Sequence, residues 1–438
     1  MTRLRIALAG TVAAMAATVL LLGGVLNESE QAEAGGAAAA ATPDQFVAQF
    51  APGDTNAVVR DLQQRLRTRP DDVESSVLLG LAYQQRVRET ADFSDLTRSE
   101  GILERARELD PANADAIGGL ATLALARHDF RRALMLGRKA RRLAPSTARH
   151  YGVVGDALLE LGRYREAFAS FDRMVRLKPN VASYARVSYA RELLGDKPGA
   201  IKVMQFALDA AAGRREALAW THLQLGKIYL GMGRLQPAEA QFLAALEVFP
   251  TYLYGFEARA QLALAAGRNR EAVAFAVRAA DAVPLPQFVV SLADIYRASG
   301  NRPAAREQYA LMDVIQRLLR ANGVNSDLEL ALFRIDHGIR LREGLQLARA
   351  ARVDRPSIFG DDVLAWALAR NGRCDEARVY SKRSLRLGTK DASMYFHRGM
   401  IERCLGRKAE AARWFTRALE TNPHFSPFWA DVARRYSS

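Results

Sequence analysis

The chain has 438 residues, of which 49% are hydrophobic and 25% are charged, and this composition excludes a wholly disordered protein. Its 62 lysines and arginines outnumber 48 acidic residues, so the formal net charge is +14. Such a field attracts acidic proteins, anionic lipids, cell-wall polymers or nucleic acid. The basic residues are dispersed rather than clustered, which is typical of solvated helix faces. Two cysteines are too few for a disulfide scaffold, so apolar packing must hold the fold together.

Residues 1–26 read as a membrane-targeting segment. Arg3 and Arg5 precede an uncharged stretch over residues 6–26, and about 20 apolar residues suffice to span a bilayer as a helix. Acidic residues follow it, so the N-terminus is expected inside and the body of the protein outside. The segment is either an uncleaved transmembrane anchor, which its length favours, or a cleaved signal peptide that would leave a secreted or periplasmic protein. Residues 27–54 are expected to be a flexible tether rich in Ala and Gly.

A short phrase recurs along the rest of the chain, for example LGRYREAFASFDRMVRLKP over 161–179 and AGRNREAVAFAVRAADAVP over 266–284. Its glycine serves as a marker, and successive marker glycines are 33 to 38 residues apart. They are Gly162, Gly195, Gly233, Gly267, Gly300, Gly338, Gly372 and Gly406. This period predicts an array of repeated structural units.

Each unit reads as two helices. In 147–179, apolar residues at helical spacing precede Gly162, which should end the first helix. Ala167, Phe171 and Met174 then mark one face of a second helix that ends at Pro179. Small residues such as Gly155 and Ala167 would allow the two helices to approach closely.

The unit resembles the tetratricopeptide repeat, a helix–turn–helix of 34 residues with the pattern W-x2-L-G-x2-Y…A-x3-F…P. Residues 219–250 carry Leu225-Gly226, Tyr229, Ala238, Phe242 and Pro250, and similar matches lie in 286–312 and 392–423. The resemblance implies an all-α fold, a right-handed α-solenoid of about ten repeats over residues 55–423. The first unit is about 7 residues too long, which predicts an insertion near residues 85–97. Residues 424–438, with an apolar stripe at Phe425, Phe428, Trp429 and Val432, are expected to form a C-terminal capping helix.

The sequence predicts no catalytic residues, no metal site and no cofactor. None of its six histidines forms an H-E-x-x-H motif or an i, i+4 pair, and no G-x-S-x-G motif is present. Little sequence lies outside the repeats to make a catalytic domain. We therefore do not expect an enzyme or a small-molecule substrate.

Cys374 and Cys404 lie at neighbouring helix ends of the last two units. Three alternatives stay open at this point: a disulfide that joins the units, two free thiols in the core, or part of a metal site that would need further ligands.

Repeat arrays of this family bind extended or helical peptides on their concave face, through outward positions of each first helix. The resemblance implies the following groove residues: Arg149, Asp156, Tyr189, Trp220, Lys227, Tyr254, Gln261, Asp294, Arg297, Phe333, His337, Phe359, Trp366, Arg370, Phe396, Met400 and Arg403. Their mixture of aromatic residues and arginine is typical of interaction surfaces.

Two functions are compatible with these features. The favoured hypothesis is an extracytoplasmic scaffold, tethered to the cytoplasmic membrane by its N-terminal helix, that binds other proteins during envelope assembly or secretion. The alternative is an arginine-rich solenoid that binds an anionic polymer, either a cell-wall polymer or nucleic acid. The absence of basic runs with interleaved aromatic residues disfavours nucleic acid.

Overall fold

The computed structural model of the chain describes residues 55–90 and 92–437. The predicted targeting segment and tether, residues 1–54, lie outside the described residues, so both stay predictions. Within the described ranges, no helix combines the length and the apolar character that a membrane span requires.

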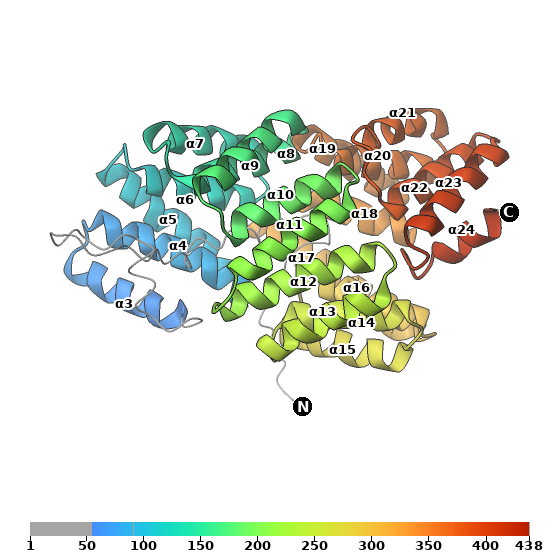
Figure 1. Cartoon of the computed structure of the whole chain (residues 1–438), viewed down its shortest axis with the longest axis horizontal. Coiled ribbons are helices and arrows are strands. Elements are labelled where there is room, and N and C mark those ends of the chain that lie inside the picture. Colours follow the sequence, from blue (N-terminus) through green and yellow to red (C-terminus); the bar gives the residue numbers. More distant parts are fainter. Residues whose placement is uncertain (1–54, 91, 438) are drawn as a thin grey trace.

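The described residues form an all-helical array without strands, as the sequence predicts (Figure 1). Ten helix pairs follow one another, from α4/α5 to α22/α23, with α3 before them and α24 after them. The helices are α3 (Thr55–Thr68), α4 (Val73–Thr90), α5 (Ser94–Leu109), α6 (Ala114–Ala126), α7 (Phe130–Leu143), α8 (Ala148–Glu160), α9 (Tyr164–Leu177), α10 (Val181–Leu193), α11 (Lys197–Ala210), α12 (Arg215–Gly231), α13 (Leu235–Val248), α14 (Leu253–Ala265), α15 (Asn269–Ala282), α16 (Pro286–Ala298), α17 (Arg302–Ala321), α18 (Asp327–His337), α19 (Leu341–Asp354), α20 (Ile358–Arg370), α21 (Cys374–Ser384), α22 (Ala392–Cys404), α23 (Lys408–Thr421) and α24 (Ala430–Tyr436).

The recurring glycine has the role that the sequence predicts for it. All eight marker glycines have a left-handed backbone, for example Gly162 with φ 70° and Gly406 with φ 76°. His128 stands at the corresponding position of the α6/α7 pair with φ 60°. Inside the pairs, glycines of the first helix lie against a large side chain of the second, as Gly155 does against Phe171. In these units the contact leaves no space for a side chain at the glycine.

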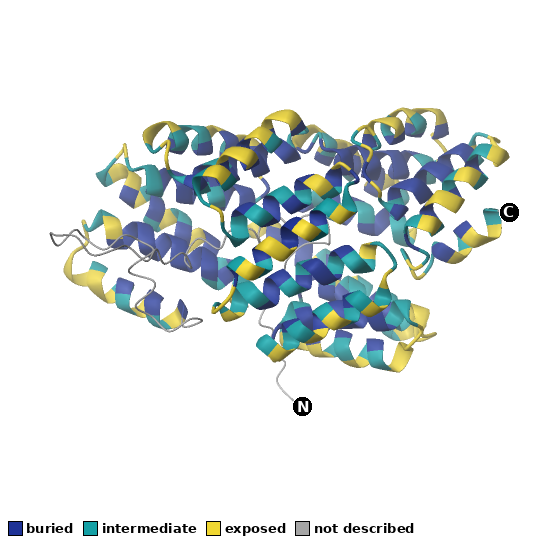
Figure 2. Cartoon of the chain, in the orientation of Figure 1, coloured by how far each residue is buried: buried dark blue, intermediate teal, exposed yellow. Residues whose placement is uncertain are grey.

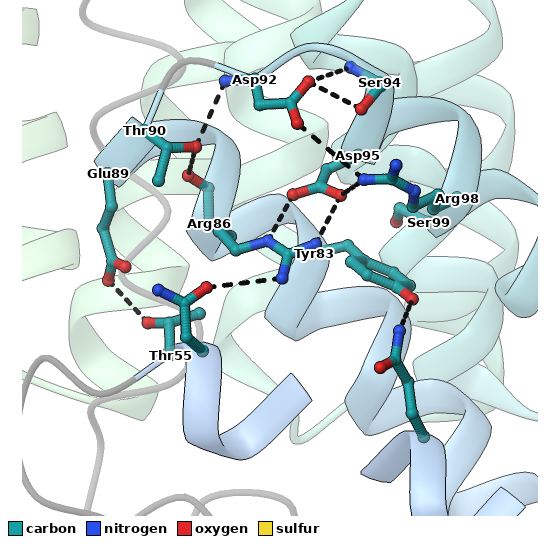
Figure 3. A network of polar contacts seen from close by, with 12 residues as sticks. Thr55, Tyr83, Arg86, Glu89, Thr90, Asp92, Ser94, Asp95, Arg98 and Ser99 are labelled. Carbon is teal, nitrogen blue, oxygen red and sulfur yellow. Dashed lines mark hydrogen bonds and ion pairs between the residues drawn. The ribbon is translucent and has the colours of Figure 1, made fainter. Parts of the chain in front are cut away.

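The same contact locates the extra residues of the first unit. Gly226 lies against Phe242, 16 positions further on, whereas Gly80 lies against Leu103, 23 positions further on. The difference is the insertion of 7 residues, and it lengthens the end of α4 and the start of α5, on either side of the connection between them. Figure 3 shows how this connection is held, because the buried carboxylate of Asp95 accepts hydrogen bonds from Arg86 at 2.6 Å and 2.7 Å.

The two 38-residue intervals between marker glycines also have a structural cause. The first contains α12, which has 17 residues where most first helices have 13, and the second contains α17, which has 20 residues. Burial still follows one pattern, because first helices such as α20 are almost wholly buried while second helices such as α21 keep an exposed face (Figure 2).

The array coils so tightly that units far apart in the sequence touch. Four successive inter-helix turns, near residues 128, 162, 195 and 233, pack against four successive inter-unit connections, near residues 325, 356, 388 and 423. In Figure 1 the end of α8 accordingly lies beside α19 and α20. We call this contact the seam. The seam joins each of these inter-helix turns to an inter-unit connection about six units further along the chain. The solenoid therefore completes one superhelical turn in about six units.

Arg355 is the most deeply buried cation of the seam. Its Nε donates to Glu160, 195 residues away, at 3.0 Å, and its Nη1 donates to Glu329 at 2.5 Å. Its guanidinium also lies over the ring of Phe130, 5.2 Å from the centroid. Burial opposes the charge of Arg355, but Glu160 and Glu329 outweigh it and raise the pKa of this guanidinium. The seam is therefore held by a buried cation with two carboxylate partners, and not by apolar contact alone.

Cys374 begins α21 and Cys404 ends α22, and the structure joins them in a disulfide with the Cα atoms 6.2 Å apart. Of the three alternatives that the sequence leaves open, the described structure has the disulfide between the last two units.

Candidate binding groove

The concave side of the superhelix holds a cavity of about 800 Å³. First helices from α10 to α20 line it, and so does the C-terminal segment that follows α23. Nine of the residues that the family resemblance assigned to the groove line this cavity: Tyr189, Trp220, Lys227, Tyr254, Gln261, Asp294, Phe333, His337 and Phe359. The structure thus brings together the middle part of the assigned set.

The assigned residues of α8 are placed elsewhere. Asp156 is buried and accepts three hydrogen bonds from Arg186, the shortest at 2.7 Å. Arg149 is ion-paired with Asp115 of the preceding unit. Both side chains are thus engaged in contacts between units rather than in the cavity.

The other assigned residues of α16, α20 and α22 contact the C-terminal residues or the core instead of open space. Trp366 and Phe396 are buried, and both lie against Trp429. Arg297 and Arg370 lie over the rings of Phe428 and Trp429. The two remaining members of this group are Met400, packed against the C-terminal core, and Arg403, over the ring of Tyr436.

Helix α12 presents hydrogen-bond donors to the cavity. Trp220, Gln224 and Lys227 share one face of this helix and line the cavity together. The indole Nε1 of Trp220 and the amide Nε2 of Gln224 are buried and have no partner among the described residues. Burial lowers the pKa of Lys227, although the charge of Glu257 opposes this shift. Unpaired buried donors are costly, so a bound molecule whose acceptors reach these two atoms would be stabilised by pairing with them.

Helices α14 and α16 present acceptors to the same cavity. Burial raises the pKa of Glu257, while Lys227 and neighbouring hydrogen bonds oppose that shift. The side-chain oxygen Oε1 of Gln287 is buried and unpartnered among the described residues, and Asp294 adds a carboxylate. A polypeptide backbone carries one donor and one acceptor per residue, so a lining with both kinds of group suits a peptide segment.

A histidine and two carboxylates stand where the cavity meets the C-terminal segment. His337 Nε2 lies 2.7 Å from Asp294 Oδ1, which also accepts a hydrogen bond from Tyr309 at 2.5 Å. Burial opposes protonation of His337, but its hydrogen bond to Asp294 and the charge of that carboxylate outweigh burial and raise its pKa. Asp336 accepts a hydrogen bond from Trp366 Nε1 at 2.7 Å. This end of the groove therefore favours cations and aromatic rings.

Sequence reasoning missed several lining residues, among them Gln224, Glu257 and Gln287. Gln224 lies one helical turn after the assigned Trp220, and Glu257 follows the assigned Tyr254 by three positions, so helical spacing was the available signal. Across the described ranges, no group of three or more His, Cys, Asp or Glu side chains is placed to hold a metal ion.

Comparisons with known proteins agree with the repeat architecture. A family model described as tetratricopeptide repeat matches residues 119–182 and 363–424, and a second model with the same description matches 221–252. These stretches correspond to α6–α9, α20–α23 and α12–α13. A search of curated proteins found no match.

Solved structures include similar helical-repeat chains. A thermophilic TPR protein of Thermus thermophilus is 23% identical, over 44% of this chain and 97% of its own, with a TM-score of 0.38. The pilF protein of Pseudomonas aeruginosa is 19% identical over 50% of this chain and 94% of its own, with a TM-score of 0.37. A human IFIT1 dimer is 14% identical over 94% of this chain and 96% of its own, with a TM-score of 0.48.

Proposed function

Because the chain is a tetratricopeptide repeat protein, we propose that it is a protein-interaction scaffold that binds a segment of another protein in its concave groove. One observation carries the proposal: Trp220 and Gln224 line a cavity of about 800 Å³ with buried donors that no described residue satisfies. An extended or helical segment that displaces the side chains covering these donors would supply the missing acceptors and bury the aromatic lining.

The test is capture of the partner by the purified chain from an envelope extract, with quantification by mass spectrometry. Trp220→Phe combined with Gln224→Leu removes both donors while it keeps an aromatic ring at position 220 and a side chain of similar size at position 224. We expect at least a tenfold loss of the partner. Met135→Ala is the matched control, because this side chain is 62% exposed on α7 and does not line the cavity. Equal recovery by all three proteins contradicts the groove assignment.

We further propose that the scaffold is extracytoplasmic, tethered by residues 1–26 with its N-terminus inside, and that it acts in envelope assembly or secretion. The support is the basic start, the apolar stretch and the acidic flank of the sequence. N-terminal sequencing of the mature protein distinguishes an uncleaved anchor from a cleaved signal. Cleavage of the repeats by protease added to intact spheroplasts is the expected result, and full protection contradicts this placement.

Helix α7 favours a second candidate function, the binding of an anionic polymer. It carries Arg131, Arg132, Arg138, Lys139, Arg141 and Arg142 and no acidic residue. Several of these cations are engaged within the chain, for example Arg132 with Glu100 and Glu104. This candidate predicts that the chain is retained on a polyanion and that this retention falls steeply with salt. Retention should also be lost when the exposed Arg131 and Arg142 are replaced by Gln. No retention at low ionic strength excludes it.

A further inference from the structure

The segment between α23 and α24, residues 422–429, lies along the concave face rather than only at the end of the array. Asn422, Pro423, Phe425 and Ser426 line the cavity together with helices of units much earlier in the chain. The chain thus places its own C-terminal segment, which is folded in turns, beside the cavity where a partner segment is proposed to bind.

The start of this segment is held at the seam. Asn422 Nδ2 donates to the carbonyl of Leu230 at 3.0 Å, across 192 residues of sequence. Pro423 is packed so closely on Gly233 that a side-chain Cβ there would come within 2.7 Å of its ring. The segment therefore starts from a defined point at the edge of the groove.

Phe428 occupies a site formed by a cation and a histidine. The guanidinium of Arg297 on α16 lies 4.1 Å from the centroid of its ring. His337 on α18 meets the same ring edge to face at 6.2 Å, and Asp294 holds that imidazole in place. A cation over an aromatic face is attracted to the ring quadrupole, so this site selects an aromatic side chain.

Trp429 occupies a neighbouring aromatic site. Its ring meets Trp366 of α20 edge to face at 5.8 Å and Phe396 of α22 at 5.5 Å. Arg370 lies 5.2 Å above it, and the Nη1 of that arginine has no hydrogen-bond partner among the described residues. The two sites together therefore accept two consecutive aromatic residues.

Phe428 and Trp429 differ from the aromatic residues of the core. Both remain only partly buried, whereas Phe396 and Phe415 are fully buried. The end of the array is covered by α24, whose Ala433 is fully buried and whose Tyr436 contacts Phe415 at 6.2 Å, and Trp429 packs with it on the core of the last units. Phe428 instead contacts Arg297 and His337 of earlier units, and these contacts are not part of the covering of the last unit.

We propose that Pro427-Phe428-Trp429 is a built-in ligand of the groove, and that the partner is a protein segment with two adjacent aromatic residues that displaces it. This inference rests on the proposed function and names its partner class. A tethered ligand competes at an effective concentration in the millimolar range for a short linker, and a groove that is rarely vacant binds its partner proportionally more weakly. The segment therefore sets a minimum affinity, which a partner must exceed in order to displace it.

The test uses the full chain and a fluorescein-labelled peptide with the sequence of residues 423–431, followed by fluorescence anisotropy. Phe428→Ala combined with Trp429→Ala vacates both sites, and we expect this variant to bind the peptide at least tenfold more tightly than the wild type. Arg297→Ala added to that background should abolish the gain. Phe206→Ala is the matched control, because this aromatic ring is 45% exposed on α11 and contacts neither site. A scrambled peptide should bind none of the proteins.

Hydrogen exchange on the unmodified chain gives a second readout that needs no variant. Excess peptide should accelerate exchange in residues 423–429 and leave α22 and α23 unchanged. Equal peptide affinity of the vacated variant and the wild type, or no binding to either, overturns the built-in ligand. In that case, loss of partner capture in the Trp220→Phe, Gln224→Leu variant still supports the groove function, so the two proposals fail separately.

Discussion

Replacement of Arg355 by Leu should open the seam and destabilise the whole array. The change removes the cation that pairs with Glu160 at 3.0 Å and with Glu329 at 2.5 Å, and it leaves both carboxylates without this partner. Breaking a buried ion pair by removing one partner costs about 3–5 kcal/mol, because the remaining charge stays desolvated. Glu160 and Arg355 are only 1% and 3% exposed, so the full range applies here.

The assay combines urea unfolding, followed by circular dichroism, with the radius of gyration from small-angle X-ray scattering. Arg355→Leu should lower the free energy of unfolding by about 3–5 kcal/mol and increase the radius of gyration, since the contact joins units 195 residues apart. Arg163→Leu is the matched control. Its ion pair with Glu166 is local and exposed, so its loss should change the free energy of unfolding far less than the loss of Arg355.

A triple change of Arg355, Glu160 and Glu329 to Leu should recover part of the lost stability, because no charge is then left buried. The reasoning is refuted if Arg355→Leu unfolds within about 1 kcal/mol of the Arg163→Leu control and keeps the radius of gyration of the wild type.

Three further predictions concern single positions. Gly195→Ala should destabilise the protein by roughly 1–3 kcal/mol more than Gly372→Ala. Both glycines have left-handed backbones, but only Gly195 faces the carbonyl of Gly388 at the seam. Equal unfolding midpoints of the two variants in urea would contradict this. Burial opposes protonation of His337, but the hydrogen bond to Asp294 outweighs it and raises the pKa of His337 above the unfolded value of about 6.5. The protonated histidine therefore contributes its full stabilisation below about pH 6.5, and this contribution is lost as pH rises through the folded pKa. The stability difference between wild type and His337→Asn should therefore be larger at pH 6 than at pH 9, and a difference independent of pH argues against it. Reduction of the Cys374–Cys404 bond, whose separation is 30 residues, should cost about 3–4 kcal/mol. Hydrogen exchange should then rise in α21 and α22 but not in α4 to α9, and uniform protection with and without reductant would show that the bond does not stabilise the last units.

The sequence alone determined the units of this fold. Helix ends follow from the backbone conformation of single residues, so the left-handed glycines could be placed without a structure. The pairing of Gly226 with Phe242 repeats in several units at one spacing, because it depends only on contacts within a unit. Even the insertion in the first unit was visible as a shift of the period.

The groove was predictable in part, for a related reason. Trp220, Lys227 and Tyr254 could be assigned because outward positions of a first helix repeat with the unit. Asp156 could not be excluded, since its partner Arg186 lies in the next unit and no local pattern distinguishes an inter-unit ion pair from a ligand-binding carboxylate.

Only the tertiary structure decided the seam and the course of the C-terminal segment. Each unit is rotated against its neighbour, and the rotations add over six units until Glu160 meets Arg355, so small differences such as the longer α12 and α17 change which residues meet. The apolar stripe of Phe425, Phe428 and Trp429 predicted a cap. The coiling of the array brings α16, α18 and α20 under this segment, and it therefore places Phe428 against Arg297 and His337, and Trp429 against Trp366, next to the groove.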